Sequence, residues 1–482
     1  MRLKSGRWLV SGSVLCLASF GADTPPLPPL PNPDYAASLT PGQLIEPIDL
    51  ASALRLVGAR DLDVAIARER VIISVAELDQ AKALWLPSLF LGPQWVRHDG
   101  QAQVVEGTVR NISKSSLFVG GSAAAGSVGA GPVLAGGPAN LSGLTSVLRF
   151  SDAIFEPLAA RQSVVARKAG VNTATNDALL GLAEAYFDLQ QAAGRIQLAR
   201  EAVDHAEALA NLTRSYAKAG AGLEADYRRA LVERDRQQRA VEEAVGQLEV
   251  ASAELVRRTR LDPQILLAPI EPPVATVRLL NDSVTLDELI PTALTNRPEL
   301  AQSQAFVKAT LVRLKQARLR PLIPSLALQA SGGGFGGGKN DFFGAFNTRG
   351  DVGVNLFWTV QNMGATDHTI VRARQSEQRV ANLELFKLQD RVASEVVAAH
   401  KASHAATRQL AFATSALPEA KSSVELNLKR IKQGAGLPLE ALQPIQALAV
   451  ARREYLDSAI AFNRAQFRLF RAIGQPPLLP AK

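Results

Sequence analysis

His400 and His404 are the residues of this sequence whose type and spacing come nearest to a metal site. Histidines four residues apart lie on one face of a helix, where their ring nitrogens can share a metal ion. No glutamate follows His400, and no third ligand is evident among the other histidines, which are His98, His205 and His368. We therefore interpret the pair as solvated or packed side chains, and we expect neither a metal nor a cofactor.

No other group of residues has the spacing of a catalytic site. The glycine-rich segment 126–131 lacks the Lys-Ser/Thr ending of a phosphate loop. No nucleophile, base and orienting residue form a recognisable pattern, so we do not expect an enzyme. The formal net charge is +8, but basic and acidic residues are mixed along segments such as 228–236. This mixture predicts solvated helix faces rather than a nucleic-acid site.

The first 22 residues have the pattern of a secretory signal peptide. Arg2, Lys4 and Arg7 form a basic start, and an apolar stretch follows at 8–20. That stretch is too short for a membrane-spanning helix, and small residues come after it. We therefore expect residues 1–22 to be removed on export.

Cys16 is the only cysteine, so the mature chain is expected to contain no disulfide. A bacterial lipidation site at Cys16 is the alternative to a cleaved signal. The next segment, 23–47, is proline-rich and predicts a spacer without a core of its own. No later segment has about twenty consecutive apolar residues, although an exported chain can still enter a membrane as a β-barrel.

The chain contains an internal repeat in which the same features recur in the same order. Residues 80–89 read QAKALWLPSL, and residues 316–326 read QARLRPLIPSL. The sequence Gly-Ala-Gly-Leu occurs at 220–223 and again at 434–437. A repeat of this length predicts a fold with internal pseudo-symmetry. Because the repeat has no unique polar cluster, it favours a scaffold or a conduit over a catalytic domain.

The first repeat is expected to span residues 48–263, with strands inside about 88–150. Its expected elements are a helix capped by Asp49, a helix from about Asp61, strands at 88–96 and 144–150, a glycine-rich loop at 120–143, a very long helix at 159–218, a turn at 219–223 and a return helix at 224–260.

A linker at 264–284 leads to the second repeat at 285–476, with strands inside about 325–360, and to a tail at 477–482. The expected elements are a helix with a Thr285/Glu288 capping box, a helix capped by Asn296, strands at 325–330 and 350–360, a glycine-rich loop at 332–338, a very long helix at 365–433, a turn at 433–437 and a return helix at 438–473.

The strands have the alternation of a two-faced sheet. In 351–357 apolar residues alternate with polar residues or glycine. Aromatic residues lie at these strands and their edges, among them Trp95, Phe357 and Trp358. Each expected hairpin is isolated between long helices, which favours a membrane wall over the core of a soluble sandwich.

These features together resemble the TolC-like outer-membrane efflux protein family, over about residues 48–475. The duplication, the Asn-x-Pro-Glu-Leu helix start at 296–300, the Pro-Ser strand entries and the glycine turns carry the resemblance. The resemblance implies an α+β membrane protein that forms a homotrimer. Each chain would give four strands to a transmembrane β-barrel in the bacterial outer membrane. The long helices would continue the barrel as a coiled-coil tunnel into the periplasm.

The implied function is an outer-membrane channel subunit of a tripartite efflux or type I secretion system. Its implied partners are outer-membrane lipid, a periplasmic adaptor (membrane fusion protein) and, through the adaptor, an inner-membrane pump. The residues that match the adaptor-binding tips are Gly220, Gly222, Leu223, Gly434, Gly436 and Leu437.

The resemblance also implies a ring of acids that closes the tunnel mouth. Asp226 and Glu440 each lie six residues after the first glycine of a tip. Where the family often has a second acid, this chain has Gln443. The possible gate residues are therefore Glu440, Asp226 and Gln443.

Two other interpretations remain open from the sequence. A soluble periplasmic coiled-coil scaffold would have the same helices with small hairpins between them. An envelope hydrolase would show a metal dependence through His400 and His404.

Overall fold

The computed structural model describes residues 44–103, 109–125, 146–281, 284–338, 344–433, 436 and 438–476. The expected signal peptide, Cys16, most of the proline-rich segment and the tail 477–482 lie outside these residues. The chain divides into two compact units, each of which takes segments from both halves of the sequence. Unit 1 is Met1–Ala65, Thr173–Arg297 and Arg391–Lys482, and unit 2 is Ile66–Asn172 and Pro298–Asp390.

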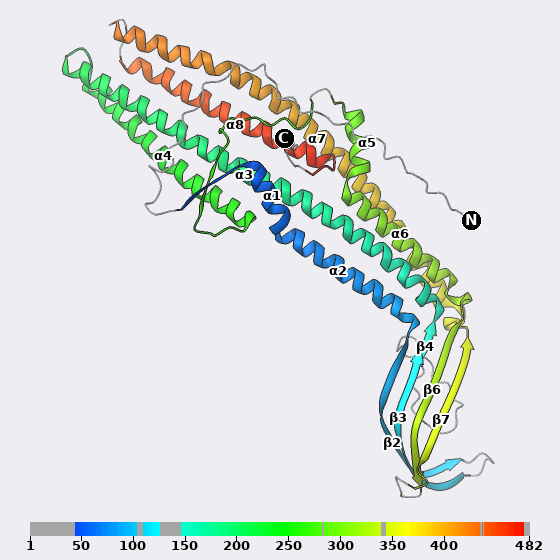
Figure 1. The fold of residues 1–482 in the computed structure, drawn as a ribbon. Coiled ribbons are helices and arrows are strands. Elements are labelled where there is room, and N and C mark those ends of the chain that lie inside the picture. Colours follow the sequence, from blue (N-terminus) through cyan, green and yellow to red (C-terminus); the bar gives the residue numbers. More distant parts are fainter. Residues whose placement is uncertain are drawn as a thin grey trace, which may run out of the picture. The chain divides into compact units, whose positions relative to one another are not determined.

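The described part of the chain is mostly helical (Figure 1). Its α-helices are α1 (Leu50–Arg60), α2 (Leu62–Lys82), α3 (Phe150–Lys218), α4 (Glu224–Thr259), α5 (Leu286–Asn296), α6 (Pro298–Leu319), α7 (Ala365–Lys432) and α8 (Leu442–Ala472). The two very long helices are confirmed, since α3 has 69 residues and α7 has 68. None of the described helices has a stretch long and apolar enough to cross a membrane.

Carboxylate side chains cap the first two helices, and the cap at Asp49 confirms the prediction from the sequence. Asp49 accepts a hydrogen bond from the amide of Ser52, and Asp61 accepts from the amides of Asp63 and Val64. These carboxylates satisfy first-turn amides that have no partner inside the helix.

The two caps expected in the second half are wrong in detail. Thr285 is the N-cap of α5, but it makes no side-chain capping bond. Asn296 caps nothing, because it is the last residue of α5. The amide of Arg297 still bonds to the carbonyl of Ala293, so α6 follows directly at Pro298.

Unit 2 contains an antiparallel sheet, visible in Figure 1. Its strands are β2 (Pro87–Gln103), β3 (Val109–Ala125), β4 (Ser146–Arg149), β6 (Ser325–Gly338) and β7 (Asn347–Phe357). β3 and β4 pair with successive stretches of one edge of β6, while β7 pairs with its other edge. The sheet is therefore four strands wide, with β2 and β7 at its edges in the described part of the chain.

The glycine-rich segments are not loops where the sequence placed them. Residues 120–125 belong to β3, and 332–338 belong to β6; the rest of the first expected loop, from residue 126 to 143, lies outside the described residues. Gly120 pairs with Gly333, and Gly121 pairs with Gly332. Glycine weakens a strand, but its backbone groups complete the ladder when neighbouring strands supply partners.

An aromatic side chain covers these glycines on one face. A Cβ at Gly334 or Gly336 would lie 2.6 Å and 2.5 Å from the Phe346 ring. The missing side chains thus leave the space that the ring occupies, an arrangement that stabilises a glycine-rich strand.

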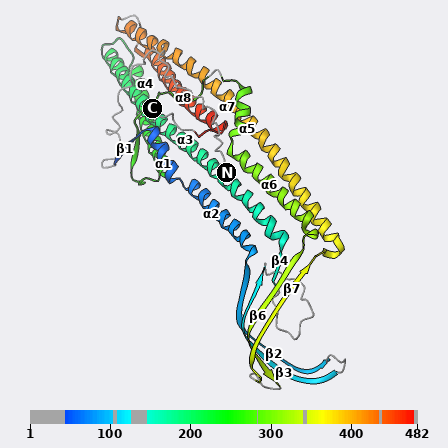
Figure 2. The same cartoon turned by 45° about the vertical axis from the view of Figure 1, so that its right-hand side comes forward.

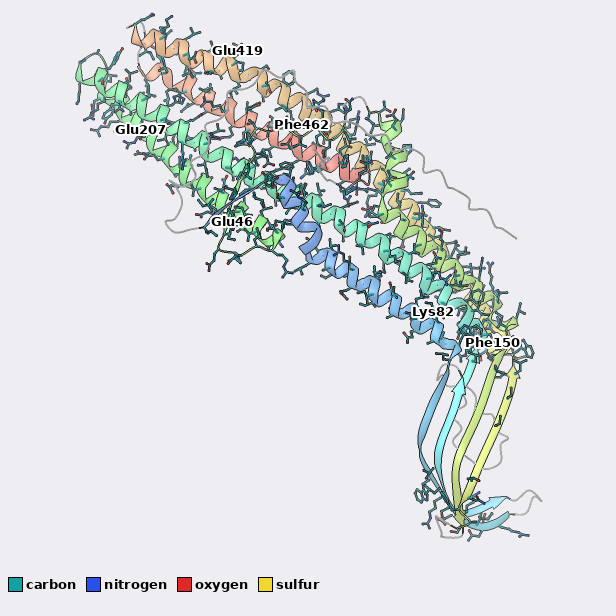
Figure 3. The ribbon with its side chains drawn as sticks, in the orientation of Figure 1. Glu46, Lys82, Phe150, Glu207, Glu419 and Phe462 are labelled. Atoms are coloured by element: carbon teal, nitrogen blue, oxygen red, sulfur yellow. The ribbon has the colours of Figure 1, made fainter. Side chains whose placement is uncertain are left out.

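Two tryptophans tie strand ends to helices within unit 2. Trp85 donates from Nε1 to the carbonyl of Ala153, 3.0 Å away, and its ring lies 5.9 Å from that of Phe150, which Figure 3 labels. In the second half, Trp358 donates from Nε1 to the carbonyl of Leu322 at 3.3 Å. A buried or half-buried indole N–H finds a partner in this way.

Unit 1 contains two helical hairpins, α3 with α4 and α7 with α8 (Figures 1 and 2). Phe187 of α3 and Phe467 of α8 are almost fully buried against each other, and the buried Tyr186 donates a hydrogen bond to Glu271. The Phe187 and Phe467 rings lie 5.3 Å apart in an edge-to-face arrangement. The helices approach closely at Gly194, where a Cβ would lie 2.8 Å from Leu456.

The expected linker is docked on unit 1 rather than free. β1 (Ile45–Ile48) pairs in parallel with β5 (Leu266–Pro269), a small sheet that the sequence did not predict. Asn463 accepts from the amide of Val277 and donates to the carbonyl of Ala275, at 2.8 and 2.7 Å. Oε1 of Gln466 accepts hydrogen bonds from the amides of Leu279 and Leu280. Polar side chains of α8 therefore replace the backbone partners of a strand.

We expect Asn463→Ala to lower the free energy of unfolding by about 1–2 kcal/mol, because two partly buried backbone groups lose their partner, the buried Asn463 side chain. Denaturant unfolding of the purified protein measures this change. Asn427→Ala is the matched control: its amide bonds only to Ser423 in the same helix, so we expect a change within about 0.5 kcal/mol. An equal loss in both variants would contradict the docking role of Asn463.

Candidate functional site

The turn between α3 and α4 is built around two glycines. Gly220 has a φ of +74°, a left-handed conformation that glycine adopts without strain. A Cβ at Gly222 would lie 3.2 Å from Cβ of Tyr216 and 3.4 Å from the amide nitrogen of Ala217, so the chain turns against its own helix end. Leu223 is 68% exposed. The turn thus presents an apolar side chain to solvent at a tightly closed helix end.

The turn between α7 and α8 is described only in part. Gly434 and Leu437 lie outside the described residues. Gly436 is described, and a Cβ there would lie 3.1 Å from Oε2 of Glu440 and 3.2 Å from Nε of Arg430. A short 3-10 helix (Pro438–Ala441) then leads into α8.

The two helical hairpins are joined next to these turns. Tyr216, near the end of α3, donates a hydrogen bond to the carbonyl of Ile431 in the last turn of α7, at 3.0 Å. Beneath this bond lies an apolar cluster of Leu209, Ala210, Ala230, Val424, Ile431, Ala441, Ile445 and Leu448. The structure therefore brings together two turns that are about two hundred residues apart in the sequence.

Sequence reasoning missed Tyr216. Its position four residues before Gly220 was the available signal, but a tyrosine at the end of a helix has no pattern of its own.

Glu440 forms an ion pair with Arg430, at the end of α7. Both side chains are about half exposed, so the pair is screened by solvent and contributes little to stability. Asp226 lies in the first turn of α4, with its side chain 18% exposed and 3.8 Å from Arg229. Gln443 is exposed in the first turn of α8. In one chain, therefore, each acid lies beside an arginine, and the gate role of the three residues stays a prediction.

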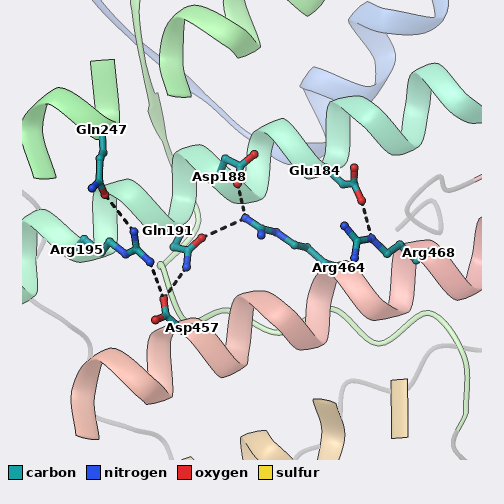
Figure 4. Close-up of polar contacts among 8 residues, drawn as sticks. All are labelled: Glu184, Asp188, Gln191, Arg195, Gln247, Asp457, Arg464 and Arg468. Atoms are coloured by element: carbon teal, nitrogen blue, oxygen red, sulfur yellow. Dashed lines mark hydrogen bonds and ion pairs between the residues drawn. The ribbon is translucent and has the colours of Figure 1, made fainter. Parts of the chain in front are cut away.

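A ladder of polar contacts joins α3 to α8 further from the turns (Figure 4). Arg464 contacts Asp188 and Gln191, and Arg468 pairs with Glu184 at 2.7 Å. In a third pair the arginine is on α3 and the acid is on α8: Arg195 lies 3.4 Å from Asp457. Single pairs of this exposure contribute at most about 1 kcal/mol each, but a ladder fixes the register of two helices.

We expect Tyr216→Phe to loosen the contact between the two turns. Losing one hydrogen bond costs about 1 kcal/mol, which raises the fraction of separated turns about fivefold. The amide hydrogen-exchange rate of residues 216–223 is the measurement. Tyr227→Phe, on the neighbouring α4, is the matched control, because no hydrogen bond of its hydroxyl holds the turns together. An unchanged exchange rate in Tyr216→Phe would contradict the role of this bond.

A sheet four strands wide, combined with two very long helices whose turns meet, is the fold of solved outer-membrane channels. The chain is similar to the outer membrane protein VceC of Vibrio cholerae, with 14% identity, 88% of this chain and 96% of that chain covered, and a TM-score of 0.71. It is similar to the CmeC outer membrane channel of Campylobacter jejuni, with 15% identity, 88% of this chain and 85% of that chain covered, and a TM-score of 0.71. For the MtrE outer membrane channel of Neisseria gonorrhoeae the identity is 17%, the coverage 89% of each chain and the TM-score 0.68.

Residues 289–475 match the family of outer membrane efflux proteins. No curated protein matches the sequence. The family match and the shared fold confirm the resemblance to TolC-like outer-membrane efflux proteins. This family consists of channel proteins rather than enzymes.

Proposed function

We propose that this chain is the outer-membrane channel subunit of a tripartite efflux or type I secretion system, acting as a passive export duct. The observation that carries the proposal is one face of β7. Val352, Val354 and Leu356 follow one another at every second position and are 85%, 64% and 54% exposed. An exposed apolar row on a strand is unfavourable in water and favourable against lipid.

The strand register extends this row across the sheet. Val119 pairs with Gly334, which pairs with Thr348, and Thr348 lies on the same side of β7 as Val352. Trp95 pairs with Leu117 on that same face, and Trp95 is 52% exposed. One face of the sheet thus presents apolar residues from β2, β3 and β7, as the lipid-facing side of a barrel wall does.

Open strand edges support a homotrimer. β2 and β7 are the edge strands of the sheet, and their directions are opposite because each pairing between them is antiparallel. β7 of one copy can therefore pair antiparallel with β2 of the next. Four strands are too few to close a barrel, whereas three copies give twelve and leave no edge.

In this proposal the channel lies in the bacterial outer membrane and the helices project into the periplasm. The paired turns, with Gly220, Gly222, Leu223 and Gly436 among their residues, form the tips that a periplasmic adaptor binds. The adaptor links the duct to an inner-membrane pump, which supplies the energy. The joint between Tyr216 and Ile431 supports this role, because it holds both turns at one surface.

Single-channel conductance in a planar bilayer, together with the mass of the protein in detergent, tests the proposal. We expect a trimer that inserts and conducts. A trimer that inserts without current would contradict an open duct for the isolated protein and require the adaptor for opening. A water-soluble monomer would overturn the channel and favour the periplasmic scaffold.

A further inference from the structure

The structure brings His400 and His404 into direct contact on α7. Their Nε2 atoms lie 3.0 Å apart, and the ring centroids are 4.4 Å apart with an interplanar angle of 71°. The two rings are packed against each other, in agreement with the sequence-based interpretation. Their Nε2 atoms are at hydrogen-bonding distance, so one of them carries the proton between them, and a metal ion that took this place would displace that proton.

We propose that His400 and His404 chelate one divalent transition-metal ion, with Cu2+ bound most tightly. A metal ion bonds imidazole nitrogen at about 2.0–2.1 Å, so two nitrogens at right angles to each other around it are about 3.0 Å apart. The observed separation matches that spacing. Right-angled ligands belong to the square-planar and tetragonal geometries of Cu2+ and Ni2+, and Cu2+ has the highest affinity for imidazole sites among first-row ions.

The surroundings provide oxygen atoms but no further strong ligand. A small cavity beside the pair is lined by Asn281, Ser403 and Gln466 as well as by the two histidines. Among the described residues, no group of three or more His, Cys, Asp or Glu side chains could hold a metal ion. The site therefore offers two nitrogens, and water or the Asn281 side chain completes the coordination. Such a site binds reversibly rather than permanently.

Because the cavity is lined from α7 and also by Leu280, Asn281 and Val284, a bound ion would tighten the contact between α7 and these three residues. This inference does not depend on the proposed export function.

Calorimetric titration of the full-length, tag-free protein in detergent with Cu2+ tests the proposal. We expect one ion per chain in addition to any weaker sites, an electron paramagnetic resonance spectrum of two-nitrogen coordination, and a higher thermal unfolding midpoint in the presence of Cu2+. His404→Phe keeps an aromatic ring but removes the nitrogen, and it should weaken this binding by at least about tenfold.

His368→Phe is the matched control, because His368 is an exposed histidine of the same helix, and its binding should equal that of the wild type. His404→Asp guards against a folding defect, since it supplies an oxygen ligand and should retain more affinity than His404→Phe. The proposal is overturned if the wild type binds no Cu2+ at about 100 µM, or if His404→Phe binds as the wild type does.

Discussion

Replacing Val352 with arginine should prevent the protein from assembling as a membrane-inserted trimer. Val352 is at the middle of β7 and is the most exposed residue of its apolar row. Arginine on the lipid side of a barrel costs about 2–4 kcal/mol at the bilayer midplane, and each of the three copies would carry one. Heat-modifiable mobility on gels and sedimentation with outer membranes measure the assembly.

Asn347→Arg is the matched control, because position 347 is an odd number of residues from Val352 and therefore lies on the opposite face of the strand. We expect this variant to assemble as the wild type does. If Val352→Arg also assembles normally, the apolar face of the sheet does not contact lipid, and the barrel proposal is wrong. If both variants fail, β7 does not tolerate arginine on either face, and the assignment of faces is wrong.

Gly436→Trp should abolish export while leaving the trimer intact. The atoms nearest a Cβ at this position belong to the ends of the Glu440 and Arg430 side chains, which can move aside. The chain should therefore still fold and insert. An indole at the turn would keep an adaptor backbone from approaching, and the duct would lose its pump. We expect efflux in a host lacking the wild-type chain to stay at the level of the empty strain.

Gly246→Trp is the control for the bulk of the new side chain. Gly246 lies within α4, away from the turns, and a Cβ there would meet nothing within 4 Å. We expect this variant to export normally and to conduct in bilayers, as Gly436→Trp should also conduct. Normal export by Gly436→Trp would show that the turn between α7 and α8 is not the surface that the adaptor binds.

The sequence was most informative where a local pattern repeats over many residues. The sequence predicted very long helices at 159–218 and 365–433, and α7 agrees with its prediction to within one residue. The other helix, α3, begins nine residues earlier than predicted, at Phe150, and includes Pro157. The return helix α4 followed from the glycine turn before it, Asp49 was a recognisable cap, and the start of α2 near Asp61 was predicted.

Secondary-structure prediction was poorest for the glycine-rich segments, because glycine adopts the backbone conformations of both turns and strands. The segment 332–338 looks like a loop because glycine favours turns, yet it lies in β6. Only the pairing of β6 with β3 and β7, and the Phe346 ring above Gly334 and Gly336, makes this strand stable. Neither contact is visible from the local sequence.

The sequence by itself indicated the resemblance to outer-membrane efflux proteins, the order of the helices and the positions of the glycine turns, because these depend on periodicity and on residues close together in the chain. The tertiary structure alone decided that Tyr216 joins the two turns, that Glu440 pairs with Arg430, that Asn463 holds the 264–284 segment, and that His400 and His404 face each other. Most of these contacts join residues far apart in the chain, and all of them depend on side-chain directions. They form only when packing has fixed the helices against their neighbours.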